Sequence, residues 1–161
     1  MDEQVEKLIS YLKLYGGKMA IGVGGKRKMD YYDDYYPGTG LRAPGAPLYG
    51  KPKSHRVSIL RRAIEEGFIE AEGDLTSSDT IIRLTEKGKA FVVRCKCGKP
   101  MTPYLITAYV KSPRFSTVKK YRRWLCEVCD RDEIEEARRE AGKAFMMVSG
   151  VAYSYTKLLL H

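Results

Sequence analysis

Four apolar residues near the N-terminus are spaced three or four positions apart, which places them on one face of an α-helix: Val5, Leu8, Ile9 and Leu12. Asp2 is a suitable N-cap residue, because a short carboxylate accepts hydrogen bonds from the free N–H groups of the first helical turn. Gly16 and Gly17 interrupt the pattern. We therefore expect a helix over residues 2–15.

Helical spacing returns after a long interval. Ser54 is a suitable N-cap, Gly67 is typical of a helix C-terminus, and the apolar face between them consists of Val57, Leu60 and Ile64. The opposite face of this predicted helix, residues 54–66, is mixed in character and is expected to be exposed; it carries His55, Ser58, Ile59 and Arg62.

Short runs rich in β-branched residues follow this helix. Residues 68–70 and 80–84 are predicted strands of a hairpin, because the Gly, Asp and Ser residues between them are typical of turns. Thr85 can cap a further helix that extends to about residue 93.

The order of helix, helix, hairpin and helix over residues 2–93 resembles a winged helix-turn-helix domain. The most specific parts are the stretch Leu60–Glu70 and the turn Leu84-Thr85-Glu86-Lys87-Gly88-Lys89. In that family the helix before the hairpin enters the major groove of DNA, and the hairpin tip, here residues 71–79, flanks it. The resemblance therefore implies nucleic-acid contacts by His55, Arg56, Ser58, Ile59 and Arg62.

Residues 22–52 form a predicted insertion into this domain. Seven Gly, four Pro and five Tyr occur there without a helical or alternating period, which indicates a long loop. A basic cluster and four tyrosines in this loop can contact phosphates and bases, and its cations are Lys26, Arg27 and Lys28. The segments Gly24–Arg27 and Ile59–Arg62 also resemble the winged-helix protein of the archaeal and eukaryotic small ribosomal subunit. A packed surface loop is the alternative interpretation.

All four cysteines occur in two close pairs separated by 28 residues: Cys95 with Cys97, and Cys126 with Cys129. Each pair can direct two thiolates at one ion, and two pairs complete the tetrahedral sulfur shell that zinc prefers. Gly98 permits the tight turn that such a loop needs, and the stretch from Cys95 to Met101 resembles the first loop of a zinc ribbon. We expect one structural zinc ion, with disulfide pairs or an iron-sulfur cluster as alternatives.

No acidic residue occurs between Glu86 and Glu127, whereas eleven Lys and Arg residues do. Since the rest of the chain holds 18 basic and 20 acidic residues, this segment accounts for the whole net charge of +9. It contains two predicted strands, 103–110 and 117–125, with interleaved basic and aromatic residues, a composition suited to contacting phosphates and stacking on bases. The candidate contact residues are Lys111, Arg114, Lys119, Lys120, Arg122 and Arg123.

A last helix is expected to begin after Cys129. Asp130 and Glu133 have the spacing of a capping box, and apolar residues continue at helical intervals: Ile134, Ala137, Ala141, Phe145 and Val148. The apolar and aromatic tail, residues 151–160, has no clear period. We expect the tail to pack on the first domain or to pair with a second copy of the chain in a homodimer.

These patterns predict an α+β protein with a winged helix-turn-helix in residues 1–93. A small zinc-ribbon-like β-hairpin module and a C-terminal helix follow in residues 94–161. The expected function is binding of nucleic acid: DNA in a transcriptional or viral regulatory role of archaeal type, or RNA in a ribosome-associated assembly role. A module for an acidic protein partner is the third hypothesis.

Other functional classes have less support. The chain has two His residues, no Gly-rich phosphate loop and no nucleophile elbow, so an enzyme is not expected. It has neither an apolar signal-like N-terminus nor an apolar run approaching ~20 residues, so we expect a cytoplasmic location and no membrane partner.

Overall fold

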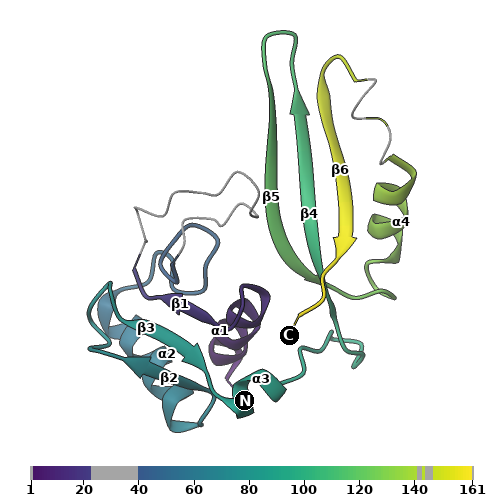
Figure 1. Ribbon diagram of the computed structural model, residues 1–161. Coiled ribbons are helices and arrows are strands. Elements are labelled where there is room, and N and C mark those ends of the chain that lie inside the picture. The colour runs from purple at the N-terminus through teal and green to yellow at the C-terminus, as the bar shows by residue number, and fades with distance from the viewer. Residues whose placement is uncertain (1, 23–39, 141–142, 144–146, 161) are drawn as a thin grey trace. The chain divides into compact units, whose positions relative to one another are not determined.

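The computed structural model describes residues 2–22, 40–140, 143 and 147–160 (Figure 1). Within these residues it contains four helices and two three-stranded antiparallel sheets, which confirms the α+β class. The described chain divides into two compact units between Phe91 and Val92. None of its described helices is both long enough and apolar enough to cross a bilayer.

The first unit contains three helices and one sheet. Its elements are α1 (Glu3–Leu14), β1 (Lys18–Ala20), α2 (Lys53–Glu65), β2 (Ile69–Glu72), β3 (Ile81–Leu84) and α3 (Glu86–Ala90). The sheet has the order β1-β3-β2, so the strand nearest the N-terminus completes the later hairpin. Asp2 caps α1 as expected, because its side chain accepts a hydrogen bond of 2.8 Å from the backbone N–H of Gln4.

Three local predictions for this unit were wrong. Helix α2 begins at Lys53 after Pro52, so Ser54 lies inside the first turn and makes no capping hydrogen bond. Ile59, expected on the exposed face of α2, is 1% exposed and belongs to the core. Helix α3 ends at Ala90, three residues earlier than expected, and Phe91 continues in extended conformation.

The described end of the predicted insertion is packed into this unit. Leu41 and Leu48 are fully buried in the same core as α1 and α2. The backbone N–H of Leu41 donates to the carbonyl of Ala20 at 3.0 Å, and that of Leu48 donates to the carbonyl of Leu41 at 2.9 Å. Residues 40–50 are therefore anchored to β1. This part of the predicted insertion agrees with the alternative interpretation of a packed loop.

The second unit is built on a long hairpin. Strands β4 (Thr102–Lys111) and β5 (Ser116–Leu125) pair over their whole length, which confirms the two predicted strands to within one residue at each end. A third strand, β6 (Gly150–Lys157), pairs with the other edge of β4 and gives the order β5-β4-β6. Helix α4 (Arg131–Glu140) packs beside β6.

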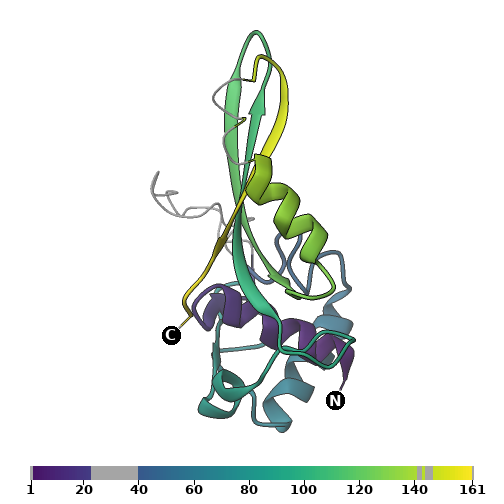
Figure 2. The ribbon, with the colours of Figure 1, turned by 90° about the vertical axis from the view of Figure 1, so that its right-hand side faces the viewer.

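Helix α4 covers one face of the lower part of this sheet, and the turn between β4 and β5 lies beyond its end (Figures 1 and 2). Ile134 of the helix joins a small core with Tyr104, Ile106 and Leu125. Tyr104 and Ile106 are two residues apart on β4, and Leu125 pairs with Thr102, two residues before Tyr104. Since side chains alternate between the faces of a sheet, these three lie on the same face.

The C-terminal part of the chain differs from the expectation. The tail was expected to pack on the first domain or on a second copy, but residues 150–157 are strand β6 and pair with β4 of the same unit. Of the apolar residues expected to continue the last helix, Ile134 and Ala137 are buried on α4, whereas Val148 lies outside it and is 76% exposed. Ala141 and Phe145 lie outside the described residues. The homodimer stays a prediction.

Candidate functional site

The two cysteine pairs converge at the base of the β4–β5 hairpin. Cys95 and Cys97 lie in the connection that precedes β4, and Cys126 and Cys129 follow β5 directly. All four sulfur atoms lie within 4.8 Å of one another. The Sγ atoms of Cys95 and Cys129 are 3.7 Å apart, and so are those of Cys97 and Cys126. Pairing of the strands therefore assembles one cluster of four thiols.

The first cysteine loop is shaped by a turn at Gly98. Its φ of +89° lies in the left-handed region, which glycine adopts without the strain that a side chain brings. The backbone N–H of Gly98 donates to the carbonyl of Cys95 at 2.9 Å, and that of Cys95 donates to the carbonyl of Lys99 at 2.9 Å. This turn directs the side chains at positions 95 and 97 to the same point.

The second cysteine loop is held by Asp130. The Asp130 carboxylate accepts a hydrogen bond of 2.7 Å from the backbone N–H of Cys126, and its own N–H donates to the carbonyl of Cys126 at 2.8 Å. The N–H of Cys129 lies 3.4 Å from the Cys126 sulfur. Donation by the backbone N–H groups of Cys129 and Val128 lowers the pKa of Cys126 to about 7, which favours a thiolate at neutral pH.

The sulfur positions suit a tetrahedral metal ion. A metal–sulfur bond of about 2.3 Å in a tetrahedral shell places neighbouring sulfurs about 3.8 Å apart, close to the observed 3.7 Å. A disulfide would bring two sulfurs to about 2.05 Å, and all four cysteines are free thiols here. The cluster can thus hold a metal ion, and four sulfur ligands would leave no position open for substrate.

Basic side chains collect at the other end of the hairpin. We call residues 107–120 of β4 and β5, with their connecting turn, the arm. Lys119 pairs with Ala108 and Lys120 pairs with Thr107, so these two neighbouring lysines project from opposite faces of the sheet. Lys111 shares the face of Lys120, and Arg114 lies exposed in the turn. No ion pair involves these four residues within the part of the chain that the structure describes.

The remaining predicted cations of the hairpin lie nearer the cysteines. Arg123 donates to the Glu133 carboxylate of α4 at 3.0 Å, and the same oxygen accepts a bond of 2.6 Å from the Tyr155 hydroxyl. Glu133, expected to take part in a capping box, therefore ties α4 to β5 and β6. Arg122 lies half-buried on the sheet face opposite to that of Arg123. Arg123 thus has a structural partner that the arm cations lack among the described residues.

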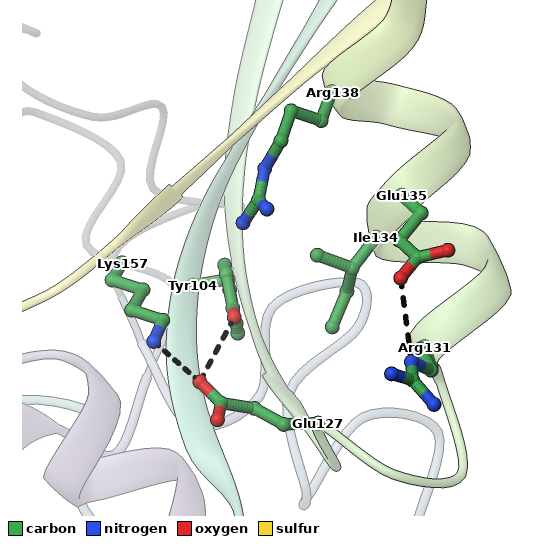
Figure 3. A pocket seen from close by; sticks show the side chains of 7 residues that line it. All are labelled: Tyr104, Glu127, Arg131, Ile134, Glu135, Arg138 and Lys157. Atoms are coloured by element: carbon green, nitrogen blue, oxygen red, sulfur yellow. Dashed lines mark hydrogen bonds and ion pairs between the residues drawn. The ribbon is translucent and has the colours of Figure 1, made fainter.

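A polar cavity of about 180 Å³ lies between α4 and the sheet, next to the second cysteine loop (Figure 3). Glu127 of that loop bonds the Lys157 ammonium at 2.6 Å and the Tyr104 hydroxyl at 3.4 Å. Donation by Lys157 lowers the pKa of Glu127, because it stabilises the carboxylate. The cavity also contains Arg131, paired with Glu135 at 3.3 Å. Glu127 therefore fastens the cysteine loop to β4 through a hydrogen bond and to β6 through an ion pair, a role that sequence spacing did not indicate.

The candidate contact residues of α2 divide into two groups. The Arg62 guanidinium forms an ion pair with Asp2 and donates to the Gln4 side chain at 3.1 Å, and the His55 ring lies 3.3 Å from the same Gln4 oxygen. Arg56 donates to the carbonyl of Lys51 at 2.6 Å, whereas Ser58 is exposed. Two of the five candidates, His55 and Arg62, are therefore engaged with the start of α1, and Ile59 is buried in the core. The other candidates, Lys26, Arg27 and Lys28, lie outside the described residues.

Comparisons of the chain with protein-family models, with curated proteins and with solved structures found no significant match.

Proposed function

We propose that this protein binds nucleic acid through the arm, and that one structural zinc ion holds the arm's base. The observation that carries the proposal is the separation of charge within the second unit. The acidic side chains Glu127, Glu133 and Glu135 make their ion pairs at the base and on α4. The arm presents cations, and the sequence around it contains no acidic residue between Glu86 and Glu127. Such a surface attracts a polyanion, because each phosphate that a cation neutralises releases counterions.

Zinc is the proposed metal because of the chemistry of the donor set. Thiolates are soft ligands, and a closed tetrahedral shell of four is typical of structural zinc sites. The pairs Cys95/Cys97 and Cys126/Cys129 flank the hairpin on both sides, so the ion would lock the ends of β4 and β5 together. The free energy of metal binding would add to the folding stability of the second unit, because this small unit has only a small apolar core.

The first unit supports a winged-helix interpretation. Its order of α1, α2, the β2–β3 hairpin and α3 is the order of helix, helix, hairpin and helix on which the resemblance rests. His55 and Arg62 contact the start of α1, however, so we assign the phosphate contacts first to the arm. Exposed acidic residues in the β2–β3 connection, Asp74 and Asp79, would repel phosphates.

A titration at several salt concentrations tests the proposal. Fluorescence anisotropy would follow binding of a labelled, mixed-sequence oligonucleotide duplex by the zinc-loaded full chain. We expect the logarithm of the association constant to fall linearly with the logarithm of salt concentration, by about 0.9 per phosphate contact. The double variant Lys111→Ala/Lys119→Ala should lower this slope by about 1.8, which corresponds to two contacts.

The matched control removes the same charge elsewhere. Lys7→Ala/Lys89→Ala deletes two exposed lysines of the first unit, each in a surface ion pair within its own helix, and should leave the slope unchanged. Absence of salt-dependent binding to DNA duplexes, single strands and structured RNA would contradict nucleic-acid binding. Equal binding to polyglutamate would instead indicate an acidic protein partner.

A further inference from the structure

The arm carries positive charge on both faces, which distinguishes it from a flat platform. Lys119 projects from the face that α4 covers further down, whereas Lys111 and Lys120 project from the other face. A single strand laid on a sheet would use the cations of one face. A groove with phosphates along both walls would use the cations of both faces at once.

The end of the arm carries an exposed aromatic ring and is held in shape. Phe115 in the turn is 59% exposed, and Val118 on β5 is 51% exposed. The backbone N–H of Ser112 donates to the carbonyl of Phe115 at 2.8 Å, and the Ser112 hydroxyl accepts from the N–H groups of Arg114 and Phe115 at 3.3 Å each. An ordered turn loses little conformational entropy when its aromatic residue becomes buried in a complex.

The thickness of the arm, measured from one face of its sheet to the other, matches the major groove of B-form DNA. Strand β6 pairs with β4 up to Lys111, where Gly150 is its partner, so the turn of residues 112–115 extends beyond a sheet of three strands. Face-to-face spacing of sheets shows that a sheet with its side chains is about 10 Å thick. The major groove of B-DNA is about 12 Å wide, so a sheet of this thickness fits between its walls when its two faces are turned toward them. The major groove of A-form RNA is too narrow for side chains to read.

We propose that the arm enters the major groove of duplex DNA tip first, with Lys119 and Lys120 on phosphates of opposite walls and Phe115 against the base edges. The apolar ring can contact thymine methyl groups on the groove floor. The inference rests on the proposed function and narrows it to one form of nucleic acid. It commits to duplex DNA because the cations on both faces, Lys119 on one and Lys111 and Lys120 on the other, are complementary to the two phosphate backbones that line the groove.

Three probes of one sequence test this geometry: a DNA duplex, an RNA duplex and the single DNA strand, each titrated with the zinc-loaded full chain. We expect the DNA duplex to bind at least on the order of tenfold more tightly than either of the others at equal salt. Phe115→Ala should weaken duplex binding on the order of tenfold with an unchanged salt slope, because it removes an apolar base contact and no charge. Tyr49→Ala is the matched control, since Tyr49 is a similarly exposed aromatic of the first unit, 58% exposed.

The two lysines test whether both faces are used. Lys119→Ala and Lys120→Ala should each lower the duplex salt slope by about 0.9. An effect of only one of them would overturn groove insertion, as would tighter binding of the single strand or the RNA duplex. Either result would leave nucleic-acid binding itself intact, whereas failure of all three probes to bind would refute the proposed function. Circular dichroism of each variant would verify that the fold is retained.

Discussion

The sulfur atoms of Cys95 and Cys129 lie 3.7 Å apart, although the two residues are 34 positions apart in the chain. The β4–β5 hairpin between them closes this distance, because its paired ends bring the two cysteine loops to one place. The cysteine cluster and the arm are therefore opposite ends of one structural element, and a change at the cluster should be transmitted to the strands.

Removal of one sulfur ligand should abolish stoichiometric metal binding. We expect the wild-type chain to contain a single zinc ion and Cys95→Ser to lose it, because three thiolates bind far more weakly than a closed shell of four. Native mass spectrometry and elemental analysis would measure the content. Lys96→Ala, an exposed residue between the first two ligands, is the control and should retain zinc. A reduced wild-type protein without zinc would disprove this assignment.

Chelation of the metal should loosen the second unit selectively. Amide exchange in residues 94–130 is expected to accelerate after treatment with a chelator, since ligand binding and folding are coupled in small metal-bound units. The core of α1 and α2 should retain its protection, because it is a separate apolar cluster. Hydrogen exchange followed by mass spectrometry resolves the two regions, and equal acceleration in both would contradict separate cores.

Arg62 should matter more for stability than for binding. Its ion pair with Asp2 and its bond to Gln4 join α2 to the start of α1. Because both charged groups are partly exposed, we expect Arg62→Ala to cost about 1 kcal/mol or less. Urea denaturation would measure the change, with the exposed Arg61→Ala on the same helix as control. A large loss of DNA affinity without loss of stability would show instead that Arg62 contacts the ligand.

Gly88 should resist replacement by alanine. Alanine normally stabilises a helix relative to glycine by about 1 kcal/mol. A Cβ atom at Gly88, however, would lie 2.2 Å from the backbone carbonyl oxygen of Phe68, and the backbone cannot move aside cheaply. We expect Gly88→Ala to destabilise the first unit by about 1–3 kcal/mol. The midpoint of urea unfolding measures this, and Lys89→Ala, in the same helix, should change it little.

The carboxyl group of Asp74 should titrate below its ordinary pKa. The backbone N–H of Thr76 donates to its oxygen at 2.9 Å and stabilises the charged form, which lowers the pKa from 3.8. Because the pKa of Asp74 is lower in the folded state than in the unfolded state, its carboxylate contributes to folding stability above the unfolded-state pKa. That contribution is lost as the pH falls through the folded value. A carbon NMR titration of Asp74 checks the prediction, and a midpoint at or above 3.8 would refute it.

Predictions from local patterns succeeded where one segment alone determines its structure. The alternation in residues 103–125 predicted both long strands, and the apolar spacing from Val5 to Leu12 predicted α1 together with its cap at Asp2. The pairing of the cysteines indicated one cluster because thiolates at such spacings share an ion. Each of these signals resides in neighbouring residues.

The errors came from segments whose structure depends on distant partners. Strand β1 has three residues, too few for a visible period, and exists because β3 offers a free edge. Strand β6 likewise follows from the second edge of β4. Ile59 lies outside the apolar stripe of Val57, Leu60 and Ile64, yet it is buried because residues of α1, β3 and the segment around Leu41 pack in the same core. Local patterns miss such features, because the residues that complete a sheet edge or a core lie far away in the sequence.

The amino-acid sequence by itself determined the chemistry available to this protein: four thiols in two pairs, and an excess of positive charge confined to one acid-free stretch. The tertiary structure decided which of these charges keep a partner. It placed Arg123 against Glu133, and it placed Lys111 and Lys119 on the arm, where neither has an ion-pair partner among the described residues. Pairing depends on distances between side chains, and only the packing of α4 and β6 against the hairpin sets those distances.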